Sequence, residues 1–412
     1  MVHILIIGYV WPEPNSSAAG SRMMQLLHCF HKNQWTISFA SPAQQTEHMA
    51  DLSILGITPE SIELNDASFD HYIAEKKADI VIFDRFMMEE QFGWRVEKFS
   101  PDSLRVLNTE DLHSLRQARH TAIKKNIEFK TEDLYSDQGI REIASIHRCD
   151  LTLMISETEA QLLQNEFHVP ETHILHLPFM LDAPTNLNSL NAFEEREHFI
   201  SIGNFRHAPN WDAVLQLKTE IWPKIRKRLP KAELHIYGAY PPPKATQLHN
   251  AKEGFLVKGW AEDAQEVMQN ARMCLAPLRF GAGIKGKLVE AMQMGTPSIT
   301  TQVGAESMHG LLPWNGVVSD DIDTFVDAAV SLYNDKENWQ LMQKNGNSIL
   351  ESRYQAEIWE PKLIQRLRLQ HQLKDSLRKK HFLGLMLRHH SMKSTQYMSQ
   401  WIELKNTTVK EN

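Results

Sequence analysis

The sequence predicts an α/β protein made of two doubly wound parallel-sheet domains that face each other across a cleft. Short apolar runs such as HILIIGYV alternate with helix-forming stretches, which is typical of parallel strands buried on both faces. The alternation stops in an irregular stretch, residues 181–197, and then starts again. The chain of 412 residues is long enough for two domains, each with its own core.

In the first half, we expect a domain at residues 1–180. The predicted strands are residues 3–10, 34–42, 79–86, 103–111 and 150–157, and the predicted helices are 18–32, 71–78 and 139–149. The stretch 181–197 contains proline, asparagine and acidic residues without periodicity, so we interpret it as a linker between domains.

The second half repeats the alternation, which predicts a second domain at residues 198–352. The predicted strands are residues 198–205, 232–240, 254–260, 272–278 and 297–303, and the predicted helices are 210–229, 261–271, 287–294, 320–335 and 337–353. In such sheets ligands bind outside the carboxyl ends of the strands, so two facing domains predict a site between them.

The last part of the chain, residues 374–412, has a different composition. It is basic and contains leucines at first, and it ends in a polar stretch that we interpret as a frayed tail from residue 394. The basic stretch 374–393 fits two roles, contact with an anionic membrane or a lipid-linked acceptor, or a solvated helix. The sequence leaves both roles open.

Composition and charge exclude several classes of protein. The formal net charge of -7 gives no support to nucleic-acid binding. The three cysteines are far apart and form neither a metal-binding pattern nor a disulfide framework. No apolar run approaches the length of a spanning helix, and the first residues lack the features of a signal peptide. We therefore expect a cytoplasmic protein, either soluble or peripheral at the inner membrane.

A glycine-rich turn with two lysines precedes the predicted helix 287–294. Glycines let backbone N–H groups approach an anion, and the helix N-terminus adds partial positive charge. Lys285 and Lys287 add full charges, and Glu290 lies one turn further along the helix. Cations for phosphates beside a carboxylate for ribose hydroxyls suit a nucleoside diphosphate. An ordinary strand-to-helix turn with solvated lysines explains the same residues about equally well.

Two common nucleotide-binding motifs are absent. The turn does not match the phosphate-binding loop pattern GxxxxGK[ST]. The first strand is followed by glycines at the wrong spacing for the GxGxxG fingerprint, which disfavours a dinucleotide-dependent dehydrogenase.

The stretch LAPLRFGAGIKGKLVEAMQMGTPSITTQVGAE resembles the donor-binding segment of retaining glycosyltransferases of the GT-B fold, family 4 (glycosyl transferases group 1). Further stretches resemble the same family in the right order: FISIGNFRHAPNWDAV, LHIYGAYPPP, FLVKGWAEDAQEVMQNARMCLAPL, HILIIGYVWPEPNSSAAGSRMMQLL, VLNTEDLHSLRQAR and CDLTLMISETEAQLL. The resemblance covers residues 1–372 and implies two Rossmann-like domains. It also implies that the helix at 353–373 crosses back to the first domain.

The resemblance implies roles for residues of the second domain. Glu290 matches the second acid of the family's E-x7-E signature, which contacts the ribose, and Lys287 matches a basic residue three positions earlier. The loop whose amides face the phosphates comprises Gly283, Ile284 and Lys285. Trp260 falls where the nucleobase packs, and it is equally well explained as a packing residue.

This sequence departs from the family pattern at three positions. Ala282 stands where the first acid of E-x7-E contacts the donor sugar, and Asn204 and Asn210 stand where an Arg and a Lys neutralise the diphosphate. We expect Arg206 or the lysines of the turn to supply the cation that the leaving diphosphate requires. Glu306 follows another strand end, and we hypothesise that it faces the sugar in place of the missing acid.

The resemblance assigns the first domain to the acceptor side. Gly20 and Ser21 lie in the loop that approaches the donor phosphate or the acceptor. Asp111 and His113 follow a predicted strand at its carboxyl end, where this fold has its site. His113 could orient the sugar or the acceptor, or it could be a helix-start residue that packs locally.

The family implies transfer of a hexose from a nucleotide-diphosphate sugar, with uridine or guanosine as the base, to a hydroxyl of a saccharide, glycoconjugate or lipid-linked acceptor. It implies retention at the anomeric carbon, and neither a metal nor a further cofactor. Polysaccharide or glycoconjugate biosynthesis is the default setting for this family. Two alternatives remain: a catalytically degenerate relative that binds a nucleotide sugar or a partner, and an epimerase acting on a nucleotide sugar.

Overall fold

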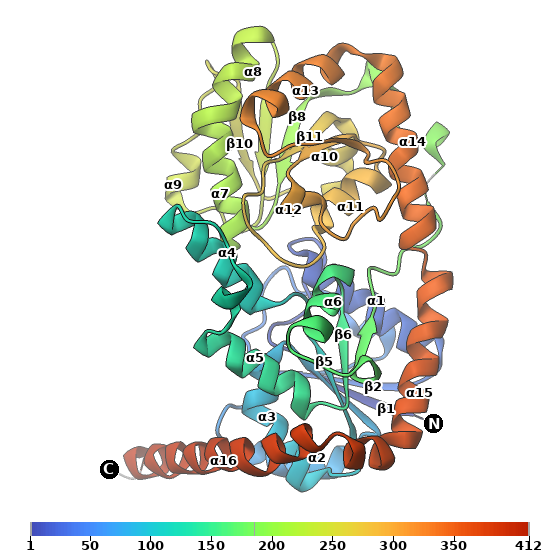
Figure 1. Ribbon diagram of the computed structural model, residues 1–412. Helices are drawn as coiled ribbons and strands as arrows, with labels where there is room; N and C mark the ends of the chain where they lie inside the picture. The colour runs from blue at the N-terminus through green and yellow to red at the C-terminus, as the bar shows by residue number, and fades with distance from the viewer. Residues whose placement is uncertain (1, 185, 411–412) are drawn as a thin grey trace.

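The structure, a computed structural model, describes residues 2–184 and 186–410 (Figure 1). Residue 185 of the predicted linker and residues 411–412 of the predicted tail lie outside the described residues. Two parallel sheets with helices around them form two domains, one above the other in Figure 1, and this confirms the predicted fold class.

The first domain is built on a seven-stranded sheet in the order β3-β2-β1-β4-β5-β6-β7, with every pair parallel. Its strands are β1 (His3–Ile7), β2 (Thr36–Ser41), β3 (Pro59–Ser61), β4 (Ile80–Asp84), β5 (Leu104–Asn108), β6 (Leu151–Met154) and β7 (Ile174–His176). The strand order reverses direction between β1 and β4, so the switch point of the sheet lies there, facing the second domain.

Helices cover both faces of this sheet. The central strand β1 is accordingly apolar on both of its faces. Ile4 and Ile6 belong to one core cluster, and Leu5 and Ile7 belong to the cluster on the other face, as the alternation of side chains along a strand requires. The covering helices are α1 (Ala18–Lys32), α2 (Ser68–Lys76), α3 (Phe86–Phe99), α4 (His113–Lys125), α5 (Asp137–Arg148) and α6 (Glu157–Asn165).

The second domain has a six-stranded parallel sheet in the order β10-β9-β8-β11-β12-β13. Its strands are β8 (Glu197–Ile202), β9 (Leu234–Tyr237), β10 (Phe255–Gly259), β11 (Ala271–Ala276), β12 (Ser298–Thr300) and β13 (Gly316–Val318). Its helices are α7 (Ala208–Gln216), α8 (Trp222–Arg228), α9 (Pro243–Thr246), α10 (Ala264–Asn270), α11 (Gly286–Gln293), α12 (Gln302–Ala305), α13 (Ile322–Asn334) and α14 (Lys336–Arg353).

The predicted helix at 210–229 is not a single regular α-helix. Helix α7 passes into a π-helical segment, Leu217–Ile221, before α8 begins. Pro223 in the first turn of α8 has no N–H to donate to the preceding turn, so the hydrogen-bond pattern changes there.

The chain crosses between the domains twice at one place. Leu181 leaves the first domain and pairs with the returning chain, donating to the Tyr354 carbonyl at 2.7 Å and accepting from the Ala356 amide at 2.7 Å. Helix α15 (Ala356–Lys380) then runs back along the first domain, where Leu363 and Leu367 are fully buried in its core.

The prediction of a frayed tail from residue 394 is wrong. Helix α16 (Phe382–Lys410) continues through this stretch and lies against α3 and α5 at the base of the first domain (Figure 1). Met392 and Ser399 are buried in that contact, and this packing stabilises a helix that its polar composition alone would not. Among the described residues, no helix has the length and apolarity that crossing a bilayer requires.

Candidate active site

A cavity of about 870 Å³ lies between the two domains, and both contribute to its walls. The first domain contributes the loops after β1, β4 and β5, and the second contributes the loops after β8 and β10 and the turn before α11. Ten of the twelve predicted site residues line it: Ser21, Asp111, His113, Arg206, Trp260, Gly283, Ile284, Lys285, Lys287 and Glu290. Gly20 and Glu306 do not line it.

The turn before α11 depends on glycine at two positions because the first domain comes close. Gly283 has a φ of 65°, and a Cβ there would lie 2.9 Å from the Cβ of Asp111. A Cβ on Gly286 would lie 2.4 Å from the Cβ of Ala18, at the start of α1. The glycines therefore let the N-terminus of α11 face both the cavity and the first domain.

Lys287 is a cation on this wall without a carboxylate partner. Its Nζ donates to the Asn210 Oδ1 at 2.7 Å, and the Asn210 side-chain amide donates to the Asn204 carbonyl at 2.9 Å. Within the described part of the chain, no carboxylate lies within ion-pair distance of this Nζ. Burial lowers the pKa of Lys287 to about 8. The two asparagines that replace the family's basic residues thus orient the lysine without neutralising it.

Glu290 lies one turn along α11 from Lys287 and faces the same cavity. Burial raises the pKa of its carboxyl group to about 7, against the opposing effect of Lys287. Its carboxylate forms no hydrogen bond or ion pair with any residue that the structure describes. It is therefore available to accept hydrogen bonds from a ligand's hydroxyls.

The Gly283 amide, expected to face a phosphate, instead donates to the Glu159 carboxylate of the first domain. The same carboxylate accepts the Leu112 amide at 2.7 Å, at the N-terminus of α4. Burial raises the pKa of Glu159 to about 7. Lys285 is buried beside it, and its Nζ donates to the Gly283 carbonyl at 2.8 Å. This part of the turn therefore joins the two domains.

Glu306 is held by an arginine of the first domain. Arg119 on α4 donates from both terminal nitrogens to the two Glu306 oxygens, each at 2.8 Å, and it also donates to the Gly281 carbonyl at 2.9 Å. The structure does not bring Glu306 into the cavity, because this bidentate pair turns its carboxylate to the domain interface. Glu306 therefore does not replace the first acid of the E-x7-E signature, where this chain has Ala282.

Arg206 lies at the exposed rim of the cavity. Its guanidinium lies 3.6 Å from the centroid of the Tyr240 ring, and the Tyr240 hydroxyl donates to Glu13 of the first domain at 3.0 Å. Trp260 is 38% exposed and stacks on His48 of the first domain, with ring centroids 4.6 Å apart. Both predicted residues thus have an open face, and Trp260 also contacts the first domain directly, whereas Arg206 is linked to it only through Tyr240.

On the first-domain wall, Asp111 and Arg116 neutralise each other beside a neutral histidine. Asp111 pairs with Arg116, and its Oδ1 lies 3.3 Å from the His113 Nε2. Burial would raise the pKa of Asp111, but Arg116 and His113 lower it to about 2. Burial lowers the pKa of His113 to about 4, so its ring is neutral near pH 7. The ring can therefore orient a hydroxyl without adding charge.

Gly20 and Ser21 have structural contacts in α1. A Cβ on Gly20 would lie 2.3 Å from the Glu13 carbonyl oxygen, so this position admits no larger residue without a shift. The Ser21 hydroxyl donates to the Pro14 carbonyl at 2.9 Å, although the residue reaches the cavity wall. Both residues shape the loop after β1.

Sequence reasoning missed Arg85 and Glu110, which line the cavity from the ends of β4 and β5. Both have left-handed backbones, with φ of 73° and 63°, which is uncommon for such residues. Glu110 accepts from the Asn108 side chain at 2.6 Å, and burial raises its pKa to about 7. Their place directly after apolar strands was the signal available in the sequence.

Comparisons with known proteins relate part of the chain to a family and nearly all of it to a fold. Residues 196–335 match the family model described as glycosyl transferases group 1. The sequence matches no curated protein. Solved structures share the fold across nearly the whole chain.

One is a variant of S. aureus TarM crystallised with fondaparinux, alpha-GlcNAc-glycerol and UDP. It has a TM-score of 0.66 at 10% identity and covers 89% of this chain and 100% of its own. Another is Anabaena HepE with UDP and glucose, with a TM-score of 0.65 at 12% identity, covering 89% and 100%. A third is sucrose-phosphate synthase from Thermosynechococcus elongatus, with a TM-score of 0.64 at 15% identity, covering 90% and 99%. Residues 196–335 of the second domain thus match the glycosyl transferases group 1 family, and the whole chain shares the GT-B fold of these solved structures.

Proposed function

We propose that this chain is a retaining hexosyltransferase that moves a sugar from a nucleotide-diphosphate sugar to a hydroxyl of a saccharide or glycoconjugate acceptor. The observation that carries the proposal is the pair formed by Lys287 and Glu290 on one helix face in the interdomain cavity. An unneutralised cation and an unpaired carboxylate, one turn apart, match the diphosphate and the ribose of one ligand.

The donor would lie against the second domain. Lys287 would bind the diphosphate, with the N-terminus of α11 adding its partial positive charge. Glu290 would accept the ribose hydroxyls, and Arg206 would reach the phosphates from the rim. The nucleobase would pack near Trp260, and Lys285 would support the turn rather than touch the ligand, because its Nζ is bonded to the Gly283 carbonyl.

During transfer, the leaving nucleotide takes on negative charge, so the fixed cations of the second domain would lower the barrier. His113 would orient the acceptor or the transferred sugar through a neutral ring nitrogen, and Asp111 would hold that ring. Glu110 would face the acceptor hydroxyl, where a carboxyl group with a pKa of about 7 can exchange a proton. We assign no protein nucleophile and expect no requirement for a divalent ion.

Uridine is the first base to test, because the TarM and HepE structures contain UDP. The experiment is a thermal-shift panel with UDP, GDP and ADP on purified protein, since a ligand that binds only the native state raises the melting temperature. One diphosphate should stabilise the wild type, Lys287→Met and Glu290→Gln should lose that shift, and Lys227→Met on the exposed surface of α8 should keep it. If no nucleotide stabilises the wild type, the proposed donor site is wrong.

The second candidate is a degenerate relative that binds a nucleotide sugar without transfer, favoured by Ala282, Asn204 and Asn210. Product formation separates the two. Incubation of a nucleotide sugar with a radiolabelled sugar group should transfer the label to a saccharide acceptor, with release of nucleoside diphosphate, only if the chain is a transferase. The anomeric configuration of the product, read by NMR, tests retention, and the same assay with EDTA tests the metal requirement.

A further inference from the structure

Helix α16 presents an apolar, aromatic face to solvent. Met392 and Ser399 are buried on its inner side against α3 and α5. On the opposite side, large apolar residues form two groups, at residues 382–386 and 397–401, which lie on one side of the helix at its helical period and roughly 30 Å apart end to end. These residues are Phe382, Leu383, Met386, Tyr397 and Trp401, which are 69%, 43%, 44%, 64% and 59% exposed. We call these five residues the α16 face.

The α16 face carries positive charge and no acid. Lys393 lies within it, and Lys379 and Lys380 precede it, all exposed. Glu403 is the only acid in the sequence of α16, and it points inward, where its carboxylate accepts the Ala67 amide at 3.1 Å. The outer surface therefore combines aromatic rings with lysines.

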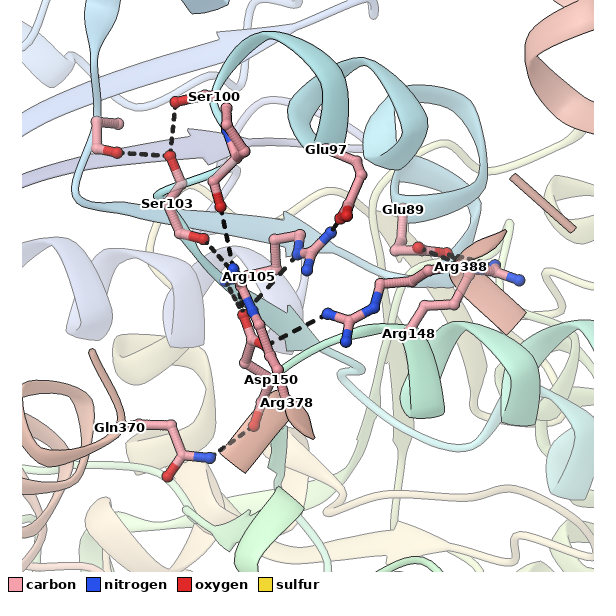
Figure 2. Close-up of polar contacts among 12 residues, drawn as sticks. Glu89, Glu97, Ser100, Ser103, Arg105, Arg148, Asp150, Gln370, Arg378 and Arg388 are labelled. Atoms are coloured by element: carbon pink, nitrogen blue, oxygen red, sulfur yellow. Dashed lines mark hydrogen bonds and ion pairs between the residues drawn. The ribbon is translucent and has the colours of Figure 1, made fainter. Parts of the chain in front are cut away.

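A buried polar network fixes the end of α15, which carries Gln370 and Arg378, and the start of α16, which carries Arg388, to the first domain (Figure 2). Arg378 donates to both Asp150 oxygens at 2.7 Å and to the Ser103 carbonyl at 2.8 Å, and Arg388 lies 3.7 Å from the same carboxylate. Gln370 on α15 donates to the Asp150 carbonyl at 2.7 Å. Two of the basic residues in 374–393 are thus turned inward, while the α16 face is held outward on a rigid support.

We propose that the α16 face docks on an anionic lipid bilayer, with α16 lying in the plane of the headgroups. Tyr and Trp side chains favour the membrane interface because the ring is apolar and one edge is polar. The Phe and Leu side chains would bury their area among acyl chains, and lysines near the surface each add about 1 kcal/mol with anionic lipid.

A second copy of this chain fits the α16 face less well. A two-fold axis through the middle of the face would bring Lys393 of one copy beside Lys393 of the other, whether the helices ran parallel or antiparallel. His389 and His390 flank this position and supply no counter-charge. Like charges at the centre of an interface oppose association, whereas anionic headgroups complement them.

The docking would also constrain the acceptor, a consequence that rests on the proposed function. Ser103 and Asp150 directly precede β5 and β6, so the network lies at the amino edge of the first sheet. The cavity lies at the opposite, carboxyl edge, where Asp111 follows β5. The five residues of β5 alone span roughly 17 Å. An acceptor attached to the same bilayer would need a head group at least that long.

The test is co-sedimentation of the full chain with vesicles of phosphatidylcholine, with or without about 30% phosphatidylglycerol. The wild type should bind the anionic vesicles at least about tenfold more tightly than the neutral ones. The variant Phe382→Ser/Tyr397→Ser/Trp401→Ser should bind the anionic vesicles much more weakly than the wild type, although its lysines keep some preference for them over the neutral vesicles. Leu311→Ser removes a fully exposed apolar side chain from the second domain, and it should bind like the wild type.

Two controls keep the result clear. The triple variant should melt at the wild-type temperature, because its substituted side chains are exposed. It should also keep any nucleotide-induced rise in melting temperature, because these side chains are far from the cavity. The thermal-shift result therefore tests the proposed function separately from membrane binding. Absent binding by the wild type, or unchanged binding by the triple variant, overturns the proposal. Light scattering that finds a dimer in the wild type and a monomer in the triple variant, without vesicle binding, would assign the face to a second copy.

Discussion

The two walls of the cavity hold their charges in different ways. On the second-domain wall, the amide of Asn210 orients Lys287 and leaves its charge uncompensated. On the first-domain wall, Asp111 is bonded to Arg116 and lies beside His113, so the group is close to balance. An amide positions a cation without cancelling it, whereas a carboxylate does both. The first arrangement suits an anionic donor, and the second suits the neutral hydroxyls of an acceptor.

The largest effect should come from the second-domain wall. Lys287→Met removes the one cation on α11 that faces the cavity without an acidic partner, so both donor binding and leaving-group stabilisation should suffer. We expect kcat/KM for transfer to fall by about 10²–10³-fold, measured as release of nucleoside diphosphate. Lys287→Arg should retain part of the activity. The control variant Lys227→Met should have the activity of the wild type. Equal activity of Lys287→Met and the wild type would contradict the comparison.

The first-domain wall should give the opposite kinetic pattern. His113→Ala removes a neutral hydrogen-bonding ring beside Asp111, so kcat should fall by about tenfold or more while the donor Kd stays unchanged. Calorimetric titration of the donor nucleotide measures the second quantity. His120→Ala, on the same helix but outside the cavity wall, is the matched control. If the donor Kd rises by the same factor by which kcat falls, His113 contacts the donor instead of the acceptor.

Donor binding should also depend on pH, through two groups of opposite sign. The pKa of Glu290 is about 7, so its carboxylate gains a proton and stops accepting hydroxyl bonds as pH falls below that value. The pKa of Lys287 is about 8, so its charge is lost as pH rises above that value. We expect the tightest binding between pH 7 and 8, with weaker binding on both sides of this range. A flat profile from pH 6 to 9 would show that neither group binds the donor.

The Arg119–Glu306 pair joins the two walls and should act on closure. Glu306→Gln and Arg119→Gln each break the same bidentate contact, so each should weaken turnover several-fold, and the double variant should be no worse than the singles. Melting temperatures and turnover rates of the wild type, the two single variants and the double variant complete this double-mutant cycle. If Glu306 touched the sugar, Glu306→Gln alone would change the preference among donor sugars, and Arg119→Gln would not.

The sequence predicted the fold because its signals are local. Apolar runs such as residues 3–10 mark buried strands wherever they lie in the chain, and the break near residue 181 marks the change of domain. The tail was predicted wrongly because α16 is stabilised by distant contacts. Its buried Met392 and Ser399 lie against α3 and α5, and nothing in the polar stretch itself indicates these partners.

In the candidate site too, local features could be predicted from the sequence and contacts between the domains could not. Lys287 and Glu290 could be predicted because one helix sets their spacing, and both line the cavity. The contacts of Glu306 and of the Gly283 amide could not, because their partners lie on the other domain, at Arg119 and Glu159. The distance between such residues in the chain, more than 120 positions, leaves no pattern that a single sequence can reveal.

The smallest effect should come from Trp260, which lies between the two walls. Its ring already stacks on His48 of the first domain, so a nucleobase would share the ring or displace that contact. Trp260→Leu should weaken binding of the preferred nucleoside diphosphate by about two- to tenfold, because one aromatic contact contributes about 0.5–1.5 kcal/mol beyond the burial of its area. His48→Ala should leave binding unchanged or strengthen it, because it frees one face of the ring. If both substitutions weaken binding equally, the stacked pair forms the base site together, and the two walls share the donor.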